Sequence, residues 1–243
     1  MISRVGRLIT RPQSAVAGNA FPSISNLVLR WKASTIAGVS EAGLLVASVA
    51  DQSASGNDGT ISASGVRYYG TAMGGNPSMG QTSPAAAGKI LATSNTSYSK
   101  VTMFMATKYI AAHTGGDTTY NSLGGKEGAY GLYINNSTGG LVLSTNSTNV
   151  ERGSGMTSTS AVRRVCARVD SGTSNGTDLL IDGVRQGSAF TFTIRDQLVK
   201  FSLFDIAGYA AISYIPEFFV FDKILNDSEV AQVDAYLLAE YGT

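Results

Sequence analysis

The chain has 243 residues, of which 14% are charged, and its formal net charge is +1. A charge so close to neutral excludes a broad electrostatic surface for nucleic acid, so we expect no nucleic-acid partner. Cys166 is the only cysteine and His113 the only histidine, which excludes an intrachain disulfide and metal sites built from several cysteines or histidines. We therefore expect no cofactor and no bound metal.

No apolar run reaches the length of a membrane span, about 18–20 residues, so no membrane partner is expected. The N-terminus also lacks the continuous apolar stretch of a secretory signal. Because charges are few, Ser, Thr, Asn and Gly must supply much of the polar surface, which is typical of strand-rich extracellular or virion proteins. A chain of this length can fold as a single β-sandwich with a sizeable core.

Residues 1–22 form a distinct basic segment, since the first acidic residue of the chain is Glu41. A disordered tail and a mitochondrial transit peptide share this composition. We interpret the segment as an ordered arm that docks on a neighbouring subunit, and residues 23–243 as one β-sandwich domain. The expected docking residues are Ile2, Arg4, Val5, Arg7, Leu8 and Arg11.

The first strand is expected at residues 26–33, where alternation places Leu27, Leu29 and Trp31 on one face. Trp31 is expected to lie in the core rather than to serve as a platform for a ligand.

A loop rich in turn-forming residues follows at 51–59. Its oxygen donors, Asp51, Asn57 and Asp58, either bind calcium or cap the turn. We prefer capping, because the ligand spacing of an EF-hand is absent.

The middle of the chain is predicted to alternate between strands and turns. Residues 70–88 carry few large side chains and predict a long surface connection. His113 is expected in a loop at 111–116. Further strands or hairpins are expected at 101–107, 129–144, 178–185, 190–194 and 200–204.

Residues 163–169 predict a strand with two different faces. Val165, Ala167 and Val169 form the apolar face. The opposite face is expected to be the wetter one; it carries Arg164, Cys166 and Arg168.

The last thirty residues predict a buried strand at 217–222 followed by a helix. Asn226 and Glu229 have the spacing of a capping box, and Gly242 stands where a helix usually ends. The buried face of this helix is expected to comprise Val230, Val233, Leu237 and Tyr241.

This terminal pattern resembles the closing signature of the concanavalin A-like lectin/glucanase (laminin-G-like) jelly rolls. The resemblance rests on Glu217, Leu225, Glu229, Tyr236-Leu237 and Tyr241-Gly242. The first strand, the loop at 51–59 and the hairpin with Asp182-Gly183 at its turn are also similar to that family. The resemblance implies an all-β fold: a two-sheet antiparallel jelly-roll sandwich with a short C-terminal helix.

We expect the protein not to be an enzyme. Hydrolysis of a glycosidic bond uses two carboxyl groups that flank the bond. Asp178 and Asp182 have the even spacing that places two side chains on the same face of a strand, but Asp182 belongs to a turn. Glu217 and Asp222 have an odd spacing, so they point to opposite faces. The sequence also lacks a Gly-x-Ser-x-Gly nucleophile elbow.

Two functions remain open. One is a structural protein of a virion, a phage capsid-decorating or tail-associated protein, because jelly rolls resembling this one occur in phage structural proteins; its partners would be other virion proteins or copies of itself. The other is a free-standing carbohydrate-binding module that recognises a cell-surface glycan. Tyrosines in or beside expected loops are the candidate contacts, although tyrosine also simply favours strands: Tyr68, Tyr69, Tyr120 and Tyr130.

Overall fold

The structure is a computed structural model, and it describes residues 20–36, 43–61, 65–81, 88–112, 119–126, 129–145, 148–194, 198–206, 209–210 and 212–242. The six expected docking residues of the arm lie outside these ranges, and so does His113. Within the described ranges, no helix is long and apolar enough to cross a membrane.

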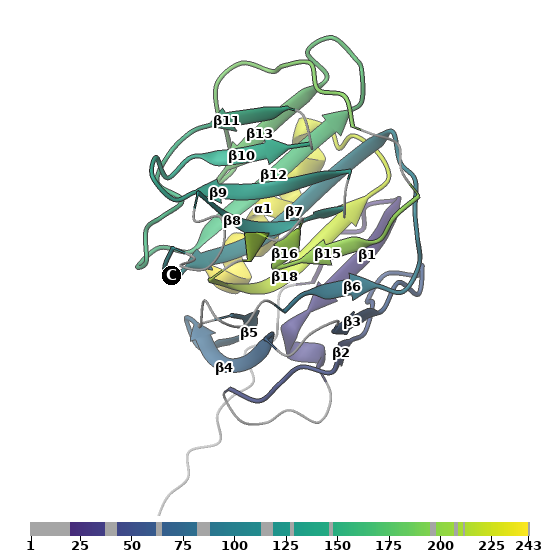
Figure 1. Cartoon of the computed structure of the whole chain (residues 1–243). Helices are drawn as coiled ribbons and strands as arrows, with labels where there is room; N and C mark the ends of the chain where they lie inside the picture. The colour runs from purple at the N-terminus through teal and green to yellow at the C-terminus, as the bar shows by residue number, and fades with distance from the viewer. Residues whose placement is uncertain are drawn as a thin grey trace, which may run out of the picture.

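Two antiparallel sheets pack face to face, as Figure 1 shows. The first sheet has the order β14 (Val184–Arg185), β13 (Thr177–Ile181), β12 (Arg163–Asp170), β7 (Lys100–Tyr109), β18 (Ser213–Phe221), β5 (Asn76–Gly80) and β4 (Arg67–Met73), and β1 (Leu27–Lys32) also pairs with β18. The second sheet has the order β11 (Asn149–Arg152), β10 (Leu141–Ser144), β9 (Tyr130–Asn135), β8 (Tyr120–Lys126), β15 (Phe201–Leu203), β6 (Ile90–Ala92), β3 (Gly59–Ile61) and β2 (Ser48–Val49).

Three smaller elements complete the described part. A two-stranded ribbon joins β16 (Asp205–Ile206) to β17 (Tyr209–Ala210), and a 3₁₀ turn, η1, covers Ala33–Thr35. The single α-helix, α1 (Asp227–Tyr241), packs against the outer face of the first sheet. These findings confirm the predicted all-β sandwich with a short C-terminal helix.

The central strands are apolar on both faces because each face is covered. In β7, Met103 and Met105 point into the core between the sheets, whereas Phe104 and Ala106 pack under α1. The same alternation holds in β18, where Phe218 faces the second sheet. The first sheet is therefore covered by apolar layers on both faces. This explains why the sequences of β7 and β18 are nearly continuous runs of apolar residues.

The predicted signals at both ends of α1 are confirmed. The side chain of Asn226 accepts a 3.0 Å hydrogen bond from the backbone of Glu229, and the Glu229 carboxylate accepts one from the backbone of Asn226 at 3.0 Å. The backbone N–H of Gly242 closes the last turn on Leu238. All four residues of the predicted apolar face are buried.

The prediction of a wet face on β12 is wrong, because α1 covers that face. Cys166 is 2% exposed, and burial raises the pKa of its thiol well above the usual value. Arg168 donates two hydrogen bonds to Asp178, at 2.8 and 2.5 Å, and Arg164 donates one to Asp234 of the helix at 2.9 Å. Arg168 is thus buried with Asp178 of the neighbouring strand, and Arg164 connects β12 to the helix.

Residues 70–88 are not one long surface connection. Gly74 and Gly75 have φ angles of 61° and 93°, and they form the turn of a hairpin between β4 and β5. Met73 and Met79 of this hairpin are fully buried. The small residues here make a tight hairpin turn.

Two further expectations are corrected in detail. A bulge in β1 turns Leu27 toward α1, so Leu27 lies on the opposite face from Leu29 and Trp31. Residues 190–194 form no strand; their only ladder contact is a bridge between Phe190 and Thr177. Trp31 is fully buried, as expected, and its indole N–H donates to the carbonyl of Asn57 at 2.9 Å.

Candidate functional site

The four predicted tyrosines do not form one cluster. Tyr130 is 2% exposed and lies in the core between the sheets, where burial raises the pKa of its phenol, so its ring cannot reach a ligand. Tyr68 also packs against that core. Tyr69 on β4 and Tyr120 on β8 lie on the outer faces of different sheets, and each contacts a tyrosine that sequence reasoning missed.

On the second sheet that partner is Tyr133. Alternation along β9 sends Tyr130 inward and Tyr133 outward. The rings of Tyr120 and Tyr133 are 6.1 Å apart between centroids and inclined by 58°, and Val142 packs beside them. The sequence signal was present, because Tyr133 stands at odd spacing from Tyr130, but the pairing with Tyr120 depends on the β8–β9 register.

Polar groups surround these rings on the same outer face. Asn135 donates a 2.8 Å hydrogen bond from Nδ2 to Glu151, and the Thr138 hydroxyl also donates to Glu151. Ser122 stands opposite Tyr133 in the β8–β9 ladder; its side chain is fully buried, and its hydroxyl has no hydrogen-bond partner. We call the following set the Tyr120–Tyr133 patch: Tyr120, Ser122, Tyr133, Asn135, Val142 and Glu151.

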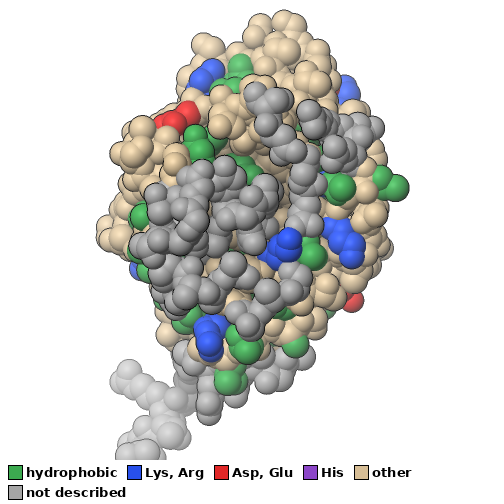
Figure 2. Space-filling view, in the orientation of Figure 1, with side chains coloured by type: hydrophobic (Ala, Val, Ile, Leu, Met, Phe, Trp, Pro, Cys, Tyr) green, Lys and Arg blue, Asp and Glu red, His purple; other side chains and the backbone are tan. Residues whose placement is uncertain are grey.

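The patch combines aromatic rings, an amide held in place and a hydroxyl without a partner. Glu151 is the only carboxylate on the eight strands of the second sheet. Hydrolysis of a glycosidic bond generally uses two, so these eight strands alone do not supply an acid–nucleophile pair. Figure 2 views the molecule from the side of this sheet, and the charged side chains visible among the described residues are few and scattered.

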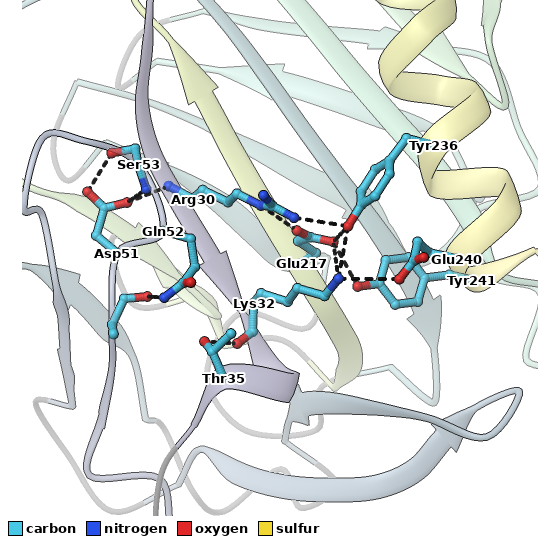
Figure 3. Close-up of polar contacts among 11 residues, drawn as sticks. Arg30, Lys32, Thr35, Asp51, Gln52, Ser53, Glu217, Tyr236, Glu240 and Tyr241 are labelled. Carbon is cyan, nitrogen blue, oxygen red and sulfur yellow. Dashed lines mark hydrogen bonds and ion pairs between the residues drawn. The ribbon is translucent and has the colours of Figure 1, made fainter. Parts of the chain in front are cut away.

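A densely bonded polar cluster lies on the other side of the sandwich, around Glu217 of β18 (Figure 3). Glu217 is fully buried and pairs with Arg30 at 2.7 Å and with Lys32 at 3.9 Å. The hydroxyls of Tyr236 and Tyr241 donate to its Oε2 at 2.9 and 2.7 Å. The sequence analysis placed Glu217 at the first residue of a predicted strand and did not predict this cluster.

This cluster is a structural connection between sheet and helix. Both carboxylate oxygens of Glu217 are occupied by partners from β1 and α1. The ring of Phe21 covers the Arg30 guanidinium at 4.2 Å and stacks on Phe219 at 4.9 Å, so residues before β1 close the cluster from outside. No side chain in the set is left to act on a ligand.

The loop at 51–59 is held by capping interactions, as preferred. Asp51 accepts hydrogen bonds from the backbone N–H groups of Arg30 and Ser53, at 2.8 and 2.9 Å, and one from the Ser53 hydroxyl (Figure 3). It also accepts one from the backbone N–H of Asn57 at 2.8 Å. Asp58 accepts a hydrogen bond from the backbone of Asp51 at 2.8 Å. Over the described residues, no group of three or more acidic, histidine or cysteine side chains is placed to hold a metal ion.

A groove of about 610 Å³ runs between α1 and the β13–β14 hairpin. Its lining combines ion-paired arginines and aspartates with apolar residues, of which Val184 and Leu238 are exposed. No aromatic ring lines this groove, so it differs in chemistry from the tyrosine patches.

No family model matches the chain, and no curated protein matches it. Among solved structures, the chain is similar to domain 4 of AbnA, a GH43 extracellular arabinanase from Geobacillus stearothermophilus solved in complex with arabinotriose, with a TM-score of 0.62 and 13% identity over 86% of this chain and 98% of that chain. It is also similar to the binding domain of Paraclostridial Mosquitocidal Protein 1, with a TM-score of 0.58 and 14% identity over 86% of this chain and 52% of that one.

A third similar structure is the Trypanosoma rangeli sialidase, with a TM-score of 0.60 and 13% identity over 91% of this chain and 34% of that one. The chain thus spans about half of the toxin binding domain and a third of the sialidase. At these identities the similarities show a shared β-sandwich fold, in agreement with the predicted resemblance.

Proposed function

We propose that this protein is a non-enzymatic carbohydrate-binding module and that the Tyr120–Tyr133 patch holds the glycan. The observation that carries the proposal is the pair of tyrosine rings on the outer face of the second sheet, where the half-buried Tyr120 packs beside Tyr133, which is 6% exposed. The fold shared with an arabinanase domain solved with arabinotriose supports it.

The chemistry of the patch suits a neutral sugar. The apolar face of a pyranose or furanose ring packs on an aromatic ring, and the hydroxyl groups at its edge need hydrogen-bond partners. Glu151 is half-buried, and its hydrogen bond with Asn135 holds both side chains in a fixed orientation beside the rings. A rigid amide and carboxylate give orientation at low entropic cost.

The direct test is a binding screen of the full chain against neutral oligosaccharides, including arabinan fragments, followed by Tyr120→Ala and Tyr120→Phe. The alanine variant should lose binding about tenfold or more, because a ring at the centre of a site contributes roughly 2 kcal/mol. The phenylalanine variant keeps the ring and should bind nearly as the parent does. If both variants bind the glycan as tightly as the parent, the glycan does not bind at this patch. If no oligosaccharide of the panel binds at millimolar concentration, the carbohydrate-binding function is rejected.

We also propose, as a second candidate, that the module serves in a virion and attaches through its basic arm. The low proportion of charged residues and the arginine-rich segment at 1–22 support this proposal. Removal of residues 1–22 should then abolish attachment to the particle and leave the sandwich folded. A truncated protein that still attaches would contradict it.

A further inference from the structure

A second pair of tyrosines lies on the opposite side of the sandwich. Tyr69 of β4 and Tyr214 of β18 are 4.9 Å apart between ring centroids, in an edge-to-face arrangement of 64°. Both rings are half-buried, so each keeps part of its surface open to a ligand. Tyr68 packs inward against the core, which places Tyr69 on the outer face of the first sheet.

The strand between them, β5, provides the floor beneath the rings. Gly80 lies under Tyr214 so closely that a Cβ at this position would come within 2.7 Å of the ring. Ser78 stands opposite Tyr69 in the β4–β5 ladder. Its side chain is fully buried, and its hydroxyl has no hydrogen-bond partner. Ser78 is therefore part of the floor beneath the rings and not a ligand contact.

The two tyrosine pairs therefore share a construction. In each, a buried serine faces one tyrosine across a strand ladder, and its hydroxyl lacks a partner: Ser122 with Tyr133, and Ser78 with Tyr69. We call the second set the Tyr69–Tyr214 patch: Tyr69, Ser78, Gly80, Lys108 and Tyr214.

The two patches differ in charge. Lys108 of β7 pairs with Tyr214 in the ladder and alternates with Phe104 and Ala106, so it lies on the outer face of the first sheet. Its ammonium forms no ion pair with any described carboxylate, and β4 and β5 contain no acidic residue. Arg67, exposed on the same edge strand, donates only to the carbonyl of Gly43. The Tyr120–Tyr133 patch instead carries Glu151.

We propose that the Tyr69–Tyr214 patch is a second carbohydrate site and that it binds an acidic sugar, carboxylated or sulfated. The half-buried rings would pack on the sugar face, and Lys108 would pair with the anionic group. The domain would then hold two glycans on opposite faces of the sandwich. This inference rests on the proposed carbohydrate-binding function and adds to it a second site and its sugar class.

The test uses the full chain with polygalacturonate and heparin fragments as acidic probes and arabinan fragments as the neutral one. Lys108→Glu should weaken binding of an acidic probe about tenfold and leave neutral binding unchanged. Lys200→Glu makes the same charge change on a half-buried lysine outside the patch and should have no effect. Tyr214→Ala should also weaken acidic binding, whereas Tyr120→Ala should not.

The outcomes separate the two proposals. If neutral glycans bind through Tyr120 while Lys108→Glu leaves the acidic probes unaffected, the second site is rejected and the proposed function stands. If Lys108→Glu and Lys200→Glu weaken acidic binding equally, the effect is general charge attraction, and the second site is also rejected. If no glycan of either class binds, both proposals fail.

Discussion

The hydroxyl of Tyr241, in the last turn of α1, donates a 2.7 Å hydrogen bond to the carboxylate of Glu217 in the middle of β18. Both side chains are buried, and 24 residues separate them in sequence. The bond fixes the end of the helix onto the sheet. It does so at a carboxylate that also receives Arg30, so the first and last elements of the described domain meet at one group.

The Tyr241→Phe variant should unfold more easily than the parent, by about 1–2 kcal/mol, because a buried hydrogen bond to a charged acceptor is lost while the ring remains. Urea unfolding followed by fluorescence measures this difference. Tyr68→Phe removes the hydroxyl of another half-buried tyrosine; it is the matched control and should change stability by less than about 0.5 kcal/mol. Equal effects of the two variants would contradict the role of Tyr241.

The Glu217→Gln variant should be more severely destabilised, by roughly 3–5 kcal/mol, because Arg30 and Lys32 lose the buried negative charge that compensates them. Lys100→Gln is the contrasting control: its partner is Asp170 at 3.2 Å, but its side chain is 59% exposed, and such pairs contribute less than about 1 kcal/mol. A Glu217 variant as stable as this control would show that the cluster is dispensable.

Acid should weaken the start of α1 in a defined pH range. A hydrogen bond from Arg168 lowers the pKa of Asp227 below its ordinary 3.8, and one from Lys223 lowers the pKa of Glu229 below its ordinary 4.5. A carboxylate whose pKa is lower in the folded state stabilises the fold above the unfolded pKa, and this contribution disappears as the pH falls through the folded pKa.

The measurement is the free energy of unfolding of the parent and of Glu229→Gln from neutral pH downward. Above about pH 4.5 the two proteins should differ by a constant amount, and below it the difference should shrink toward zero. A difference that persists unchanged in strong acid would show that the ionised carboxylate of Glu229 is not the stabilising form.

Cys166 should be inert in the native protein, because it is buried under α1 and its thiol pKa is raised. A thiol reagent such as dithionitrobenzoate should react at a rate set by opening of the structure and quickly after addition of denaturant. Fast reaction with the folded protein would mean that the helix does not cover β12 as described.

Local signals predicted much of this fold. The capping box of Asn226 and Glu229 and the tight turn at Asp182 and Gly183 depend on residues close in sequence, and both are confirmed. The prediction of a wet face on β12 was wrong because the burial of that face depends on residues distant in sequence. Alternation shows which residues share a face, but only the docking of α1 decides that Arg164 and Arg168 are buried with aspartates from other elements.

The candidate sites also depend partly on local signals and partly on contacts between segments distant in sequence. The sequence predicted Tyr69 and Tyr120 as candidate contacts. Their neighbours Tyr214 and Tyr133, and the serines opposite them, depend on strand register. A lone tyrosine in a strand pattern is equally compatible with a core position, as Tyr130 shows. Register between strands distant in sequence is set by long-range packing, which residue patterns alone do not specify.

Phe21 and Gly242 both lie on the side of the first sheet that α1 covers. A surface or fusion partner joined next to either residue would therefore hold the domain by that side. The Tyr120–Tyr133 patch would then face the surrounding solution, and the Tyr69–Tyr214 patch would turn toward the support. If both proposed sites bind sugars, the direction of attachment decides which of the two sites is accessible.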